Sequence, residues 1–525
     1  MQRLIVFLLC LLSGSLQAQT ISYNVSEAEK GGSVFDYSVR VPDGFLVLKT
    51  DRSRGFMSTR NKVETTLLLV DNDLNIKQET PFAIPEADYI NINSLQRMGD
   101  KTYFFYSKRL KRSDVVSFCA MLINETDISK SKELILGEFQ ADRDKATFDL
   151  KPSMDSTSYL LFAEVEQKKH DNKNFYFAVF DKDLNKIWDR NTTLPIEYRF
   201  IDIYSYAHKD AGKVYVSYKH YDNEVSRESI KDDDGSRIPS YSTRILVFKK
   251  EDKNPVKIPM NLGDNFVHSS DIVHNHKTDK IVVLGTYKNR HNGAVNGVYY
   301  GELDPAKDEL GPLKKTAFPM DMVELLKKDG YASRKEADPG LYIPYIAVDT
   351  KIRENGSMDY LLEYRLRQVV TQTYYAPNGG STFRQYILYK YGSIVDAHFE
   401  AGTASFVRIP KSQYQINSNS LLSLYPIVYG NKLVLLYNDD DDNATKDLSK
   451  SPDNIGNFRK AVLMAATIDE NGGLSRDIIM NTKKSDNYIT NINLIQHIDP
   501  QTLIFTQSKV KAISTKTRYG TMTIK

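Results

Sequence analysis

The densest group of potential ligands in the 525-residue sequence is a run of four adjacent carboxylates at positions 439–442, followed by Asn443. Neighbouring carboxylates repel one another unless a cation or water screens them, and carboxylate oxygens are the ligands that calcium prefers. The surrounding residues 438–457 are polar, which indicates a solvated loop. We predict a divalent-cation site, with calcium as the candidate ion, at Asp439, Asp440, Asp441 and Asp442. The alternative is a mobile loop without an ion.

Two Asp-x-Asp-Leu-Asn segments, beginning at Asp71 and Asp181, resemble the first half of a calcium-binding loop. A complete EF-hand loop also needs a glycine at its sixth position and a bidentate glutamate at its twelfth. The segment at Asp71 has Ile76 and Phe82 there, and the segment at Asp181 lacks both residues as well. We interpret both segments as tight turns, in which aspartate bonds the following backbone and asparagine takes the positive φ.

No sequence motif nominates a catalytic centre. The chain contains no G-x-S-x-G, P-loop, G-x-G-x-x-G or H-E-x-x-H pattern. His274 and His276 would share one face of a strand as a metal pair, but they fall in a recurrent polar turn, so we interpret them as turn residues. Glycoside hydrolysis needs two carboxylates at a defined separation, which sequence spacing does not supply. We therefore assign no catalytic residue and no cofactor besides the divalent cation.

The first 18 residues have the layout of a signal peptide. Arg3 is their single charge, residues 4–12 form an unbroken apolar run, and small and polar residues follow up to Ala18. The apolar run is too short to span a bilayer, which takes about 20 residues. We predict cleavage near Ala18 and export to the periplasm or the cell surface, with no transmembrane span in the mature chain.

Cysteine content and charge exclude two further classes of protein. Removal of residues 1–18 leaves Cys119 alone, so the mature chain has no internal disulfide, and its apolar surroundings predict a buried thiol. Lysine and arginine total 70 and aspartate and glutamate total 67. This near-neutral balance gives no electrostatic reason to expect a nucleic-acid partner.

Short apolar strands bounded by Asp, Asn and Gly recur along the chain, among them KVYVSYK at 213–219 and KLVLLYN at 432–438. They are grouped in four-strand units. A first polar turn precedes the most apolar strand of each unit, and a second turn carries or approximates the Asp-x-Asp-Leu-Asn pattern. The units begin near Val34, Tyr89, Thr147, Tyr198, Phe266, Tyr342, Asn419 and Tyr488.

Repeated four-stranded units predict an all-β propeller of eight blades, with seven as the alternative count. The last unit ends after its third strand, and ISYNV at 21–25 is a candidate for the missing fourth. Ring closure by both ends of the chain removes free sheet edges. We expect residues 19–525 to form a single propeller domain; two packed β domains are the rival interpretation.

One segment breaks this rhythm. Residues 318–340 place apolar side chains at Met322, Val323, Leu325 and Leu326 with charges between them, which predicts a short amphipathic helix near 321–337. We expect it to pack on one face of the ring; a helix that lines a partner site is the alternative.

The chain resembles uncharacterised secreted propeller-like repeat proteins of Gram-negative bacteria. The resemblance is carried by SLQAQ at 15–19, FDKDLNKIWDRNTTLP at 180–195 and SFVRIPKSQ at 405–413. It implies a propeller fold and an envelope location, and it carries no catalytic residues.

Two functions follow as hypotheses. The first is an exported, non-enzymatic binding or assembly module whose loops dock an envelope protein or glycan. The second is a carbohydrate-active propeller enzyme that uses carboxylates at the ring axis. Tyrosines at 374–375 and 386–391 would suit a sugar-stacking platform, but we expect them to pack between blades. Whether the protein is an enzyme stays open at this point, with the binding module favoured.

Overall fold

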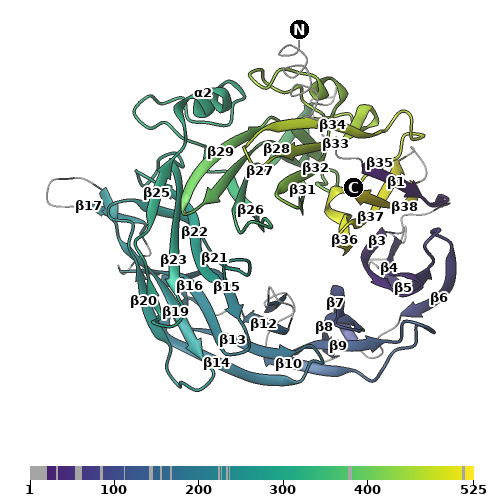
Figure 1. Ribbon diagram of the computed structural model, residues 1–525, viewed down its shortest axis with the longest axis horizontal. Helices are drawn as coiled ribbons and strands as arrows, with labels where there is room; N and C mark the ends of the chain where they lie inside the picture. Colours follow the sequence, from purple (N-terminus) through teal and green to yellow (C-terminus); the bar gives the residue numbers. More distant parts are fainter. Residues whose placement is uncertain are drawn as a thin grey trace, which may run out of the picture.

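The computed structural model describes residues 21–30, 34–53, 62–82, 87–110, 113–140, 146–153, 157–165, 168–222, 225, 227–231, 235, 237–375, 381–510 and 515–524. The predicted signal peptide, residues 1–18, lies outside the described residues. In the described part, antiparallel sheets follow one another around a central opening (Figure 1). The fold is an all-β propeller of eight blades, as the repeat predicted.

Each of the first four blades is a four-stranded meander. Blade 1 contains β3 (Val34–Val41), β4 (Gly44–Ser53), β5 (Lys62–Val70) and β6 (Ile76–Phe82). Blade 2 contains β7 (Ala87–Met98), β8 (Lys101–Leu110), β9 (Val115–Ile123) and β10 (Leu134–Gln140). Blade 3 contains β11 (Ala146–Pro152), β12 (Ser158–Val165), β13 (Asn172–Asp181) and β14 (Lys186–Glu197). Blade 4 contains β15 (Ile201–Lys209), β16 (Lys213–Tyr221), β19 (Tyr241–Lys249) and β20 (Val256–Met260), plus a hairpin of β17 (Ser229–Lys231) and β18 (Arg237–Pro239).

The later blades carry additions. Blade 5 contains β21 (Phe266–Asn275), β22 (Lys280–Lys288), β23 (Gly297–Asp304), β24 (Glu309–Leu310) and β25 (Lys314–Ala317). Blade 6 contains β26 (Tyr345–Ile352), β27 (Met358–Tyr375), β28 (Ser381–Glu400), β29 (Thr403–Ile409) and β30 (Gln413–Ile416). Blade 7 contains β31 (Tyr425–Tyr429), β32 (Lys432–Asp440), β33 (Ala461–Ile468) and β34 (Leu474–Asn481). Blade 8 contains β35 (Ile489–Thr490), β36 (Gln496–Asp499), β37 (Thr502–Val510), β38 (Thr515–Ile524), β1 (Ile21–Val25) and β2 (Glu29–Lys30).

Blade 8 joins the two ends of the chain. Strand β1 pairs antiparallel with β38, with Ile21 opposite Ile524 and Val25 opposite Gly520. The N-terminal segment therefore supplies the outer strand that the last unit lacked. A ring closed in this way leaves no gap between its first and last blades.

The core lies between neighbouring blades, and this explains why the second strand of a blade is apolar on both faces. In β32, Leu433 and Leu435 pack in a cluster with blade 6, whereas Val434 and Leu436 pack in a cluster with blade 8. Alternate side chains thus enter two different interfaces. A strand covered on both faces has a near-continuous hydrophobic sequence instead of an alternating one.

The Asp-x-Asp-Leu-Asn segments form the expected turns between third and fourth strands, with one difference. Asp71 Oδ1 accepts hydrogen bonds from the backbone N–H groups of Asp73 and Asn75 at 2.9 and 2.8 Å. The positive φ lies at Leu74 (68°), and at Leu184 (60°) in the second copy, so the prediction that asparagine adopts it was wrong. Both leucines are 4% exposed. Burial of the side chain between blades offsets the strain of the left-handed backbone.

The predicted helix is α2 (Met320–Lys328), shorter than expected, between blades 5 and 6. Met322, Val323 and Leu326 are buried in the cluster shared by those blades, which confirms that the helix packs on the ring. The remaining helical segments are single 3-10 turns, namely η1 (Tyr198–Phe200), η2 (Asp441–Ala444), η3 (Phe458–Lys460) and η4 (Ile492–Leu494). In the described part of the chain, no helix has the length and apolarity needed to cross a membrane.

Cys119 is buried in β9, and its thiol is free, as the apolar sequence around it predicted. Burial raises the pKa of this thiol to about 12. The group is therefore a packing residue and not a reactive nucleophile at neutral pH.

Candidate functional site

The meander gives the ring two chemically different faces. Connections between first and second strands and between third and fourth strands emerge at one end of each blade, which we call the turn face. Connections between second and third strands, and from one blade to the next, emerge at the other end, which we call the loop face. The turn face holds the short Asp-rich turns, whereas the loop face holds α2, the β17–β18 hairpin and residues 441–460.

At the ring axis, the first carboxylate is Asp149 on β11. The hydroxyl of Tyr206, on β15 of the next blade, donates a 2.6 Å hydrogen bond to Asp149 Oδ2. The Lys151 ammonium lies 3.3 Å from the same oxygen and 4.1 Å from the centre of the Tyr206 ring. Burial of Tyr206, followed by the adjacent Asp149 charge, raises the pKa of its phenol, so the tyrosine acts as a donor.

The second axial carboxylate is Asp271 on β21. Tyr360, from blade 6, donates a 3.0 Å hydrogen bond to Asp271 Oδ2 and lies 3.0 Å from the hydroxyl of Ser269. Burial raises the pKa of Asp271, while the Tyr360 hydrogen bond and the charge of Lys151 oppose this effect. Lys151 therefore acts on both carboxylates, although they belong to different blades.

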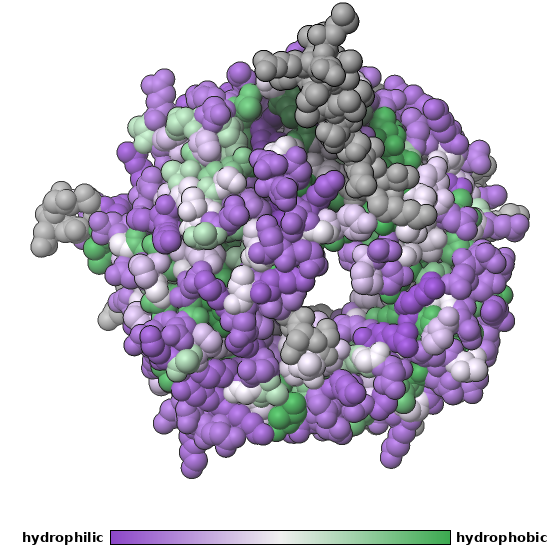
Figure 2. Space-filling model, in the orientation of Figure 1, coloured by the Kyte–Doolittle hydropathy of each residue, from purple (hydrophilic) through white to green (hydrophobic). Residues whose placement is uncertain are grey.

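Two further carboxylates on first strands are paired with lysines, whereas Asp499 on β36 accepts hydrogen bonds from the backbone of Gln501 and Thr502. Asp202 on β15 lies 3.1 Å from Lys219, and Asp349 on β26 lies 3.0 Å from Lys351. The central opening is bordered mainly by hydrophilic residues (Figure 2). Asp149, Asp202, Asp271 and Asp349 are thus held by lysine or tyrosine partners, and the tyrosine contacts to Asp149 and Asp271 also join neighbouring blades.

The predicted cation site divides in two. Asp440, Asp441 and Asp442 each present a carboxylate oxygen within 4.8 Å of the others, at the start of η2. Asp439 points elsewhere: its side chain is fully buried, and its Oδ1 accepts a 2.8 Å hydrogen bond from Asn443. Three of the four predicted ligands are brought together on the loop face, and binding of an ion there stays a prediction.

Asp439 has its own electrostatic environment. Its second oxygen, Oδ2, is buried without a hydrogen-bond partner among the described residues. Burial raises the pKa of Asp439 to about 7, against the opposing effects of the Asn443 and Asp440 hydrogen bonds and of the Lys411 charge. Lys411 is itself fully buried and pairs with Glu363. These residues form a polar layer between blades 6 and 7.

His274 and His276 do not form a metal pair in the structure. His274 Nε2 lies 3.0 Å from Asp279 Oδ1, the oxygen that also accepts from Lys209 of blade 4 at 2.6 Å. Among the described residues, the acids at 440–442 are the one group of three ligand-type side chains close enough to hold an ion. His274 lies near the end of β21 and only His276 lies in the turn, so the interpretation of both as turn residues was wrong for His274.

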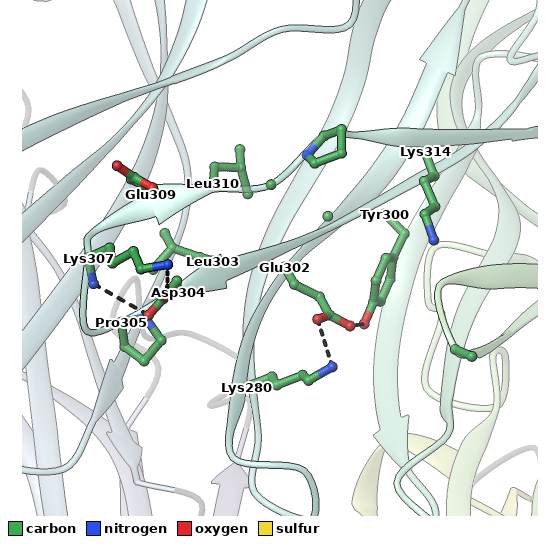
Figure 3. A pocket seen from close by; sticks show the side chains of 14 residues that line it. Lys280, Tyr300, Glu302, Leu303, Asp304, Pro305, Lys307, Glu309, Leu310 and Lys314 are labelled. Carbon is green, nitrogen blue, oxygen red and sulfur yellow. Dashed lines mark hydrogen bonds and ion pairs between the residues drawn. The ribbon is translucent and has the colours of Figure 1, made fainter.

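A cavity of about 570 Å³ opens on the turn face between blades 5 and 6 (Figure 3). Its central carboxylate, Glu302, is paired with Lys280 at 2.7 Å and accepts a 2.9 Å hydrogen bond from Tyr300. Asp304 is paired with Lys307 at 3.5 Å. Glu302 and Asp304 are thus neutralised by lysines of the same cavity, whereas Glu309, which also lines it, has no ion pair among the described residues.

The sequence did not predict the largest feature of the loop face. Strand β27 has 18 residues and β28 has 20, but β26 pairs with β27 only as far as Tyr364, and β29 pairs with β28 only from Ile394. Strand β30 pairs with β28 from Leu388 to Tyr391, so the outer part, residues 369–375 and 381–387, extends beyond the blade as a two-stranded ribbon. We call this ribbon the arm.

The arm exposes apolar side chains. Phe383 is 67% exposed and Val369 is 53% exposed. Thr373 lies opposite Phe383, and Val369 lies opposite Ile387, so these side chains share one face of the ribbon. Tyr374 is 44% exposed, so the expectation that the tyrosines pack between blades was wrong for this residue. It holds for Tyr391, which is 7% exposed.

No protein-family model matches the sequence, and no curated protein matches it. Among solved structures, the WD40 domain of SCAP from fission yeast has a TM-score of 0.37 at 8% identity, covering 96% of this chain and 98% of that one. An oligogalacturonate lyase in complex with manganese has a TM-score of 0.36 at 10% identity, covering 94% and 98%. An acylaminoacyl peptidase from Pyrococcus horikoshii has a TM-score of 0.35 at 11% identity, covering 93% and 57%. Similarity at this level carries no argument about activity.

Proposed function

We propose that this protein is an exported, non-enzymatic binding module of the bacterial envelope, and that its partner is an extended acidic polypeptide segment docked along the arm. The observation that carries this proposal is the arm itself. An isolated two-stranded ribbon is marginally stable in water, and an exposed apolar strand edge favours pairing with another chain. A partner strand would cover both the apolar face and the free edge of β27.

The arginines on the arm and at its base favour a negatively charged partner. Arg384 lies on the arm and Arg367 lies at its base on β27, and the sequence between positions 364 and 395 contains no aspartate or glutamate. Arg365 is already paired with Glu363. An acidic strand along the arm would therefore meet Arg367 and Arg384 without a repelling carboxylate. Backbone hydrogen bonds supply affinity in this mode, and side-chain charge supplies selectivity.

Export is part of the same proposal. The signal peptide predicted at 1–18 would be cleaved near Ala18, just before β1 begins at Ile21. Cleavage there removes nothing that the ring needs, since the closing strand stays intact. The resemblance to secreted repeat proteins of Gram-negative bacteria supports the same location.

Affinity capture from envelope extracts tests the proposal with a matched pair of proteins. Gln368 lies opposite Leu388, so residues 369–387 can be replaced by Asn-Gly, a two-residue loop suited to a hairpin. We expect the intact protein to enrich a partner that the protein without the arm does not bind. The Arg384→Glu variant should bind that partner more weakly. Lys253→Glu, an exposed change on the turn face, should retain it. A partner retained by the armless protein would contradict docking on the arm.

A carbohydrate-active enzyme is the second candidate, and the carboxyl groups of Asp149 and Asp271 on first strands of the ring, with the pKa of Asp271 raised by burial, favour it. Glycoside hydrolysis requires two carboxyl groups, one of which acts as an acid. Assays on polysaccharides should compare the intact protein with Asp271→Asn and Asp149→Asn. Sugar release that both variants abolish would establish the enzyme in place of the binding module.

A further inference from the structure

The loop face holds a second cavity, distant in sequence from the arm, at the junction of three connections. Its volume is about 500 Å³. Arg237 comes from the hairpin within blade 4, Arg290 and His291 from the β22–β23 connection, and Lys335 and Asp338 from the segment after α2. All these connections emerge on the same face, so the fold gathers their side chains at one place.

The described residues that line the cavity carry more positive than negative charge. They include Arg237, Arg290 and Lys335 and one carboxylate, Asp338. Asp338 is 8% exposed, and its Oδ2 accepts a 2.8 Å hydrogen bond from the backbone of Ala294. Among the described residues, no carboxylate forms an ion pair with Arg290 or Lys335. This contrasts with the turn-face cavity, where lysines and acids neutralise one another.

His291 shows the effect of this charge. Burial lowers the pKa of its imidazole, and the nearby charges of Lys288 and Arg237 lower it further. Its Nδ1 atom is buried without a hydrogen-bond partner among the described residues. An anionic ligand in the cavity would relieve the repulsion among these cations.

The walls of the cavity are held in place before any ligand binds. The backbone N–H of Asn289 donates to Asn296 at 2.7 Å, and the Asn296 amide donates to the Pro339 carbonyl oxygen at 2.7 Å. A side chain at Gly293 would approach Asp338 Oδ2 to 2.9 Å, so glycine is needed for the close packing of these two connections. A rigid cationic site loses little entropy when it binds a ligand.

We propose that this cavity binds an oxyanion group, a carboxylate, sulfate or phosphate, carried by a small polar molecule or glycan. Arg290 and Lys335 pair with the oxyanion. This site is separate from the arm, so it adds a second ligand to the proposed binding module and does not depend on the first.

Calorimetric titration of the full mature chain tests the site with four probes: glucuronate, inorganic sulfate, inorganic phosphate and neutral glucose, at constant ionic strength in sodium chloride. We expect saturable binding of at least one oxyanion and none of glucose. A preference for glucuronate would assign a carboxylate ligand, and a preference for sulfate or phosphate would assign the corresponding ester.

Two variants and a matched control locate the binding. Arg290→Gln and Lys335→Gln should each lower the affinity for the oxyanion by about tenfold or more, because each removes a charge-assisted hydrogen bond. Arg459→Gln, at an exposed arginine of the loop face on blade 7, should leave the affinity unchanged. Circular dichroism and thermal unfolding verify that all three variants fold. Absence of binding by all three oxyanions, or equal affinity in Arg290→Gln and the intact protein, would overturn the proposal.

Discussion

The hydroxyl of Tyr519 donates a 2.8 Å hydrogen bond to the carbonyl oxygen of Leu74, across 445 positions of sequence. Tyr519 belongs to the last blade and Leu74 to the turn of the first. Both residues are buried in one hydrophobic cluster. The contact locks the ring at the place where its two ends meet, and it can be tested directly.

Tyr519→Phe should destabilise the fold by about 1–3 kcal/mol, because it leaves the buried Leu74 carbonyl without its donor. Tyr23→Phe is the matched control, since Tyr23 lies on β1 in the same blade but is 46% exposed. Urea unfolding followed by far-UV circular dichroism measures both. Equal effects of the two substitutions would show that the Tyr519 hydroxyl has no special role in closure.

Asp359→Asn should cost about 1.5–3 kcal/mol, because it removes charge-assisted hydrogen bonds from the buried Arg353 guanidinium while the buried Asp396 carboxyl stays nearby. Arg353 donates to both oxygens of Asp359 at 2.8 and 2.9 Å, and both side chains are almost inaccessible to solvent. The same guanidinium donates to the Asn431 and Asp469 carbonyl oxygens of blade 7. Glu354→Gln, in an exposed ion pair with Lys277, should leave the unfolding midpoint almost unchanged. A small effect of Asp359→Asn would contradict this role.

Asp439 predicts a particular pH dependence. Its pKa is about 7 in the folded protein against an ordinary value of 3.8, so between these values the folded state holds a proton that the unfolded state has lost. Stability therefore falls as the pH rises through this window. Asp439→Asn should remove this loss and stabilise the protein above pH 7. Urea unfolding at several pH values across and above this range measures the free energy of unfolding of the intact protein and the variant. Asp477→Asn, a substitution of an exposed carboxylate, is the control. A variant that is less stable than the intact protein at high pH would contradict the prediction.

Calcium should raise the melting temperature of the protein, and a chelator should reverse the effect, if the acids at 440–442 hold the ion. A ligand at 100 times its Kd stabilises the folded state by about 2.7 kcal/mol. The triple substitution Asp440→Asn, Asp441→Asn and Asp442→Asn should abolish the calcium response, whereas Asp477→Asn should keep it. An unchanged response in the triple variant would remove the site from consideration.

The sequence predicted the ring well because polar turns interrupt apolar strands at nearly every blade. Predicted unit starts at Val34 and Phe266 coincide with the first residues of β3 and β21. The missing outer strand of the last blade was predictable for the same reason: ISYNV is a strand without a neighbour in sequence. The turn residues and the number of strands in each unit were sufficient to predict where the units begin and which strand completes the last one.

Features that depend on pairing length or distant contacts were not predictable. The strand-like pattern of residues 365–375 is the same for a strand that lies inside a blade and for one that extends beyond it. The sequence therefore did not predict the arm. The Tyr206–Asp149 bond joins residues 57 positions apart on different blades, and no local pattern encodes it. Asp439 was grouped with its neighbours because the apolar run ends at Asn438, but β32 continues to Asp440 and turns Asp439 inward.

Closure of the ring by β1 and β38 has a consequence for biosynthesis. The first strand of the described chain finds its partner only when the ten-residue strand Thr515–Ile524 has left the ribosome. Until then a long intermediate carries open strand edges, which other chains can join. Pairing across nearly the whole sequence is also slow, because the entropy of a very long loop is lost in a single step. We therefore expect the final stage of folding to depend on protection from aggregation, and a cut near the C-terminus to leave an open chain of blades in place of a ring.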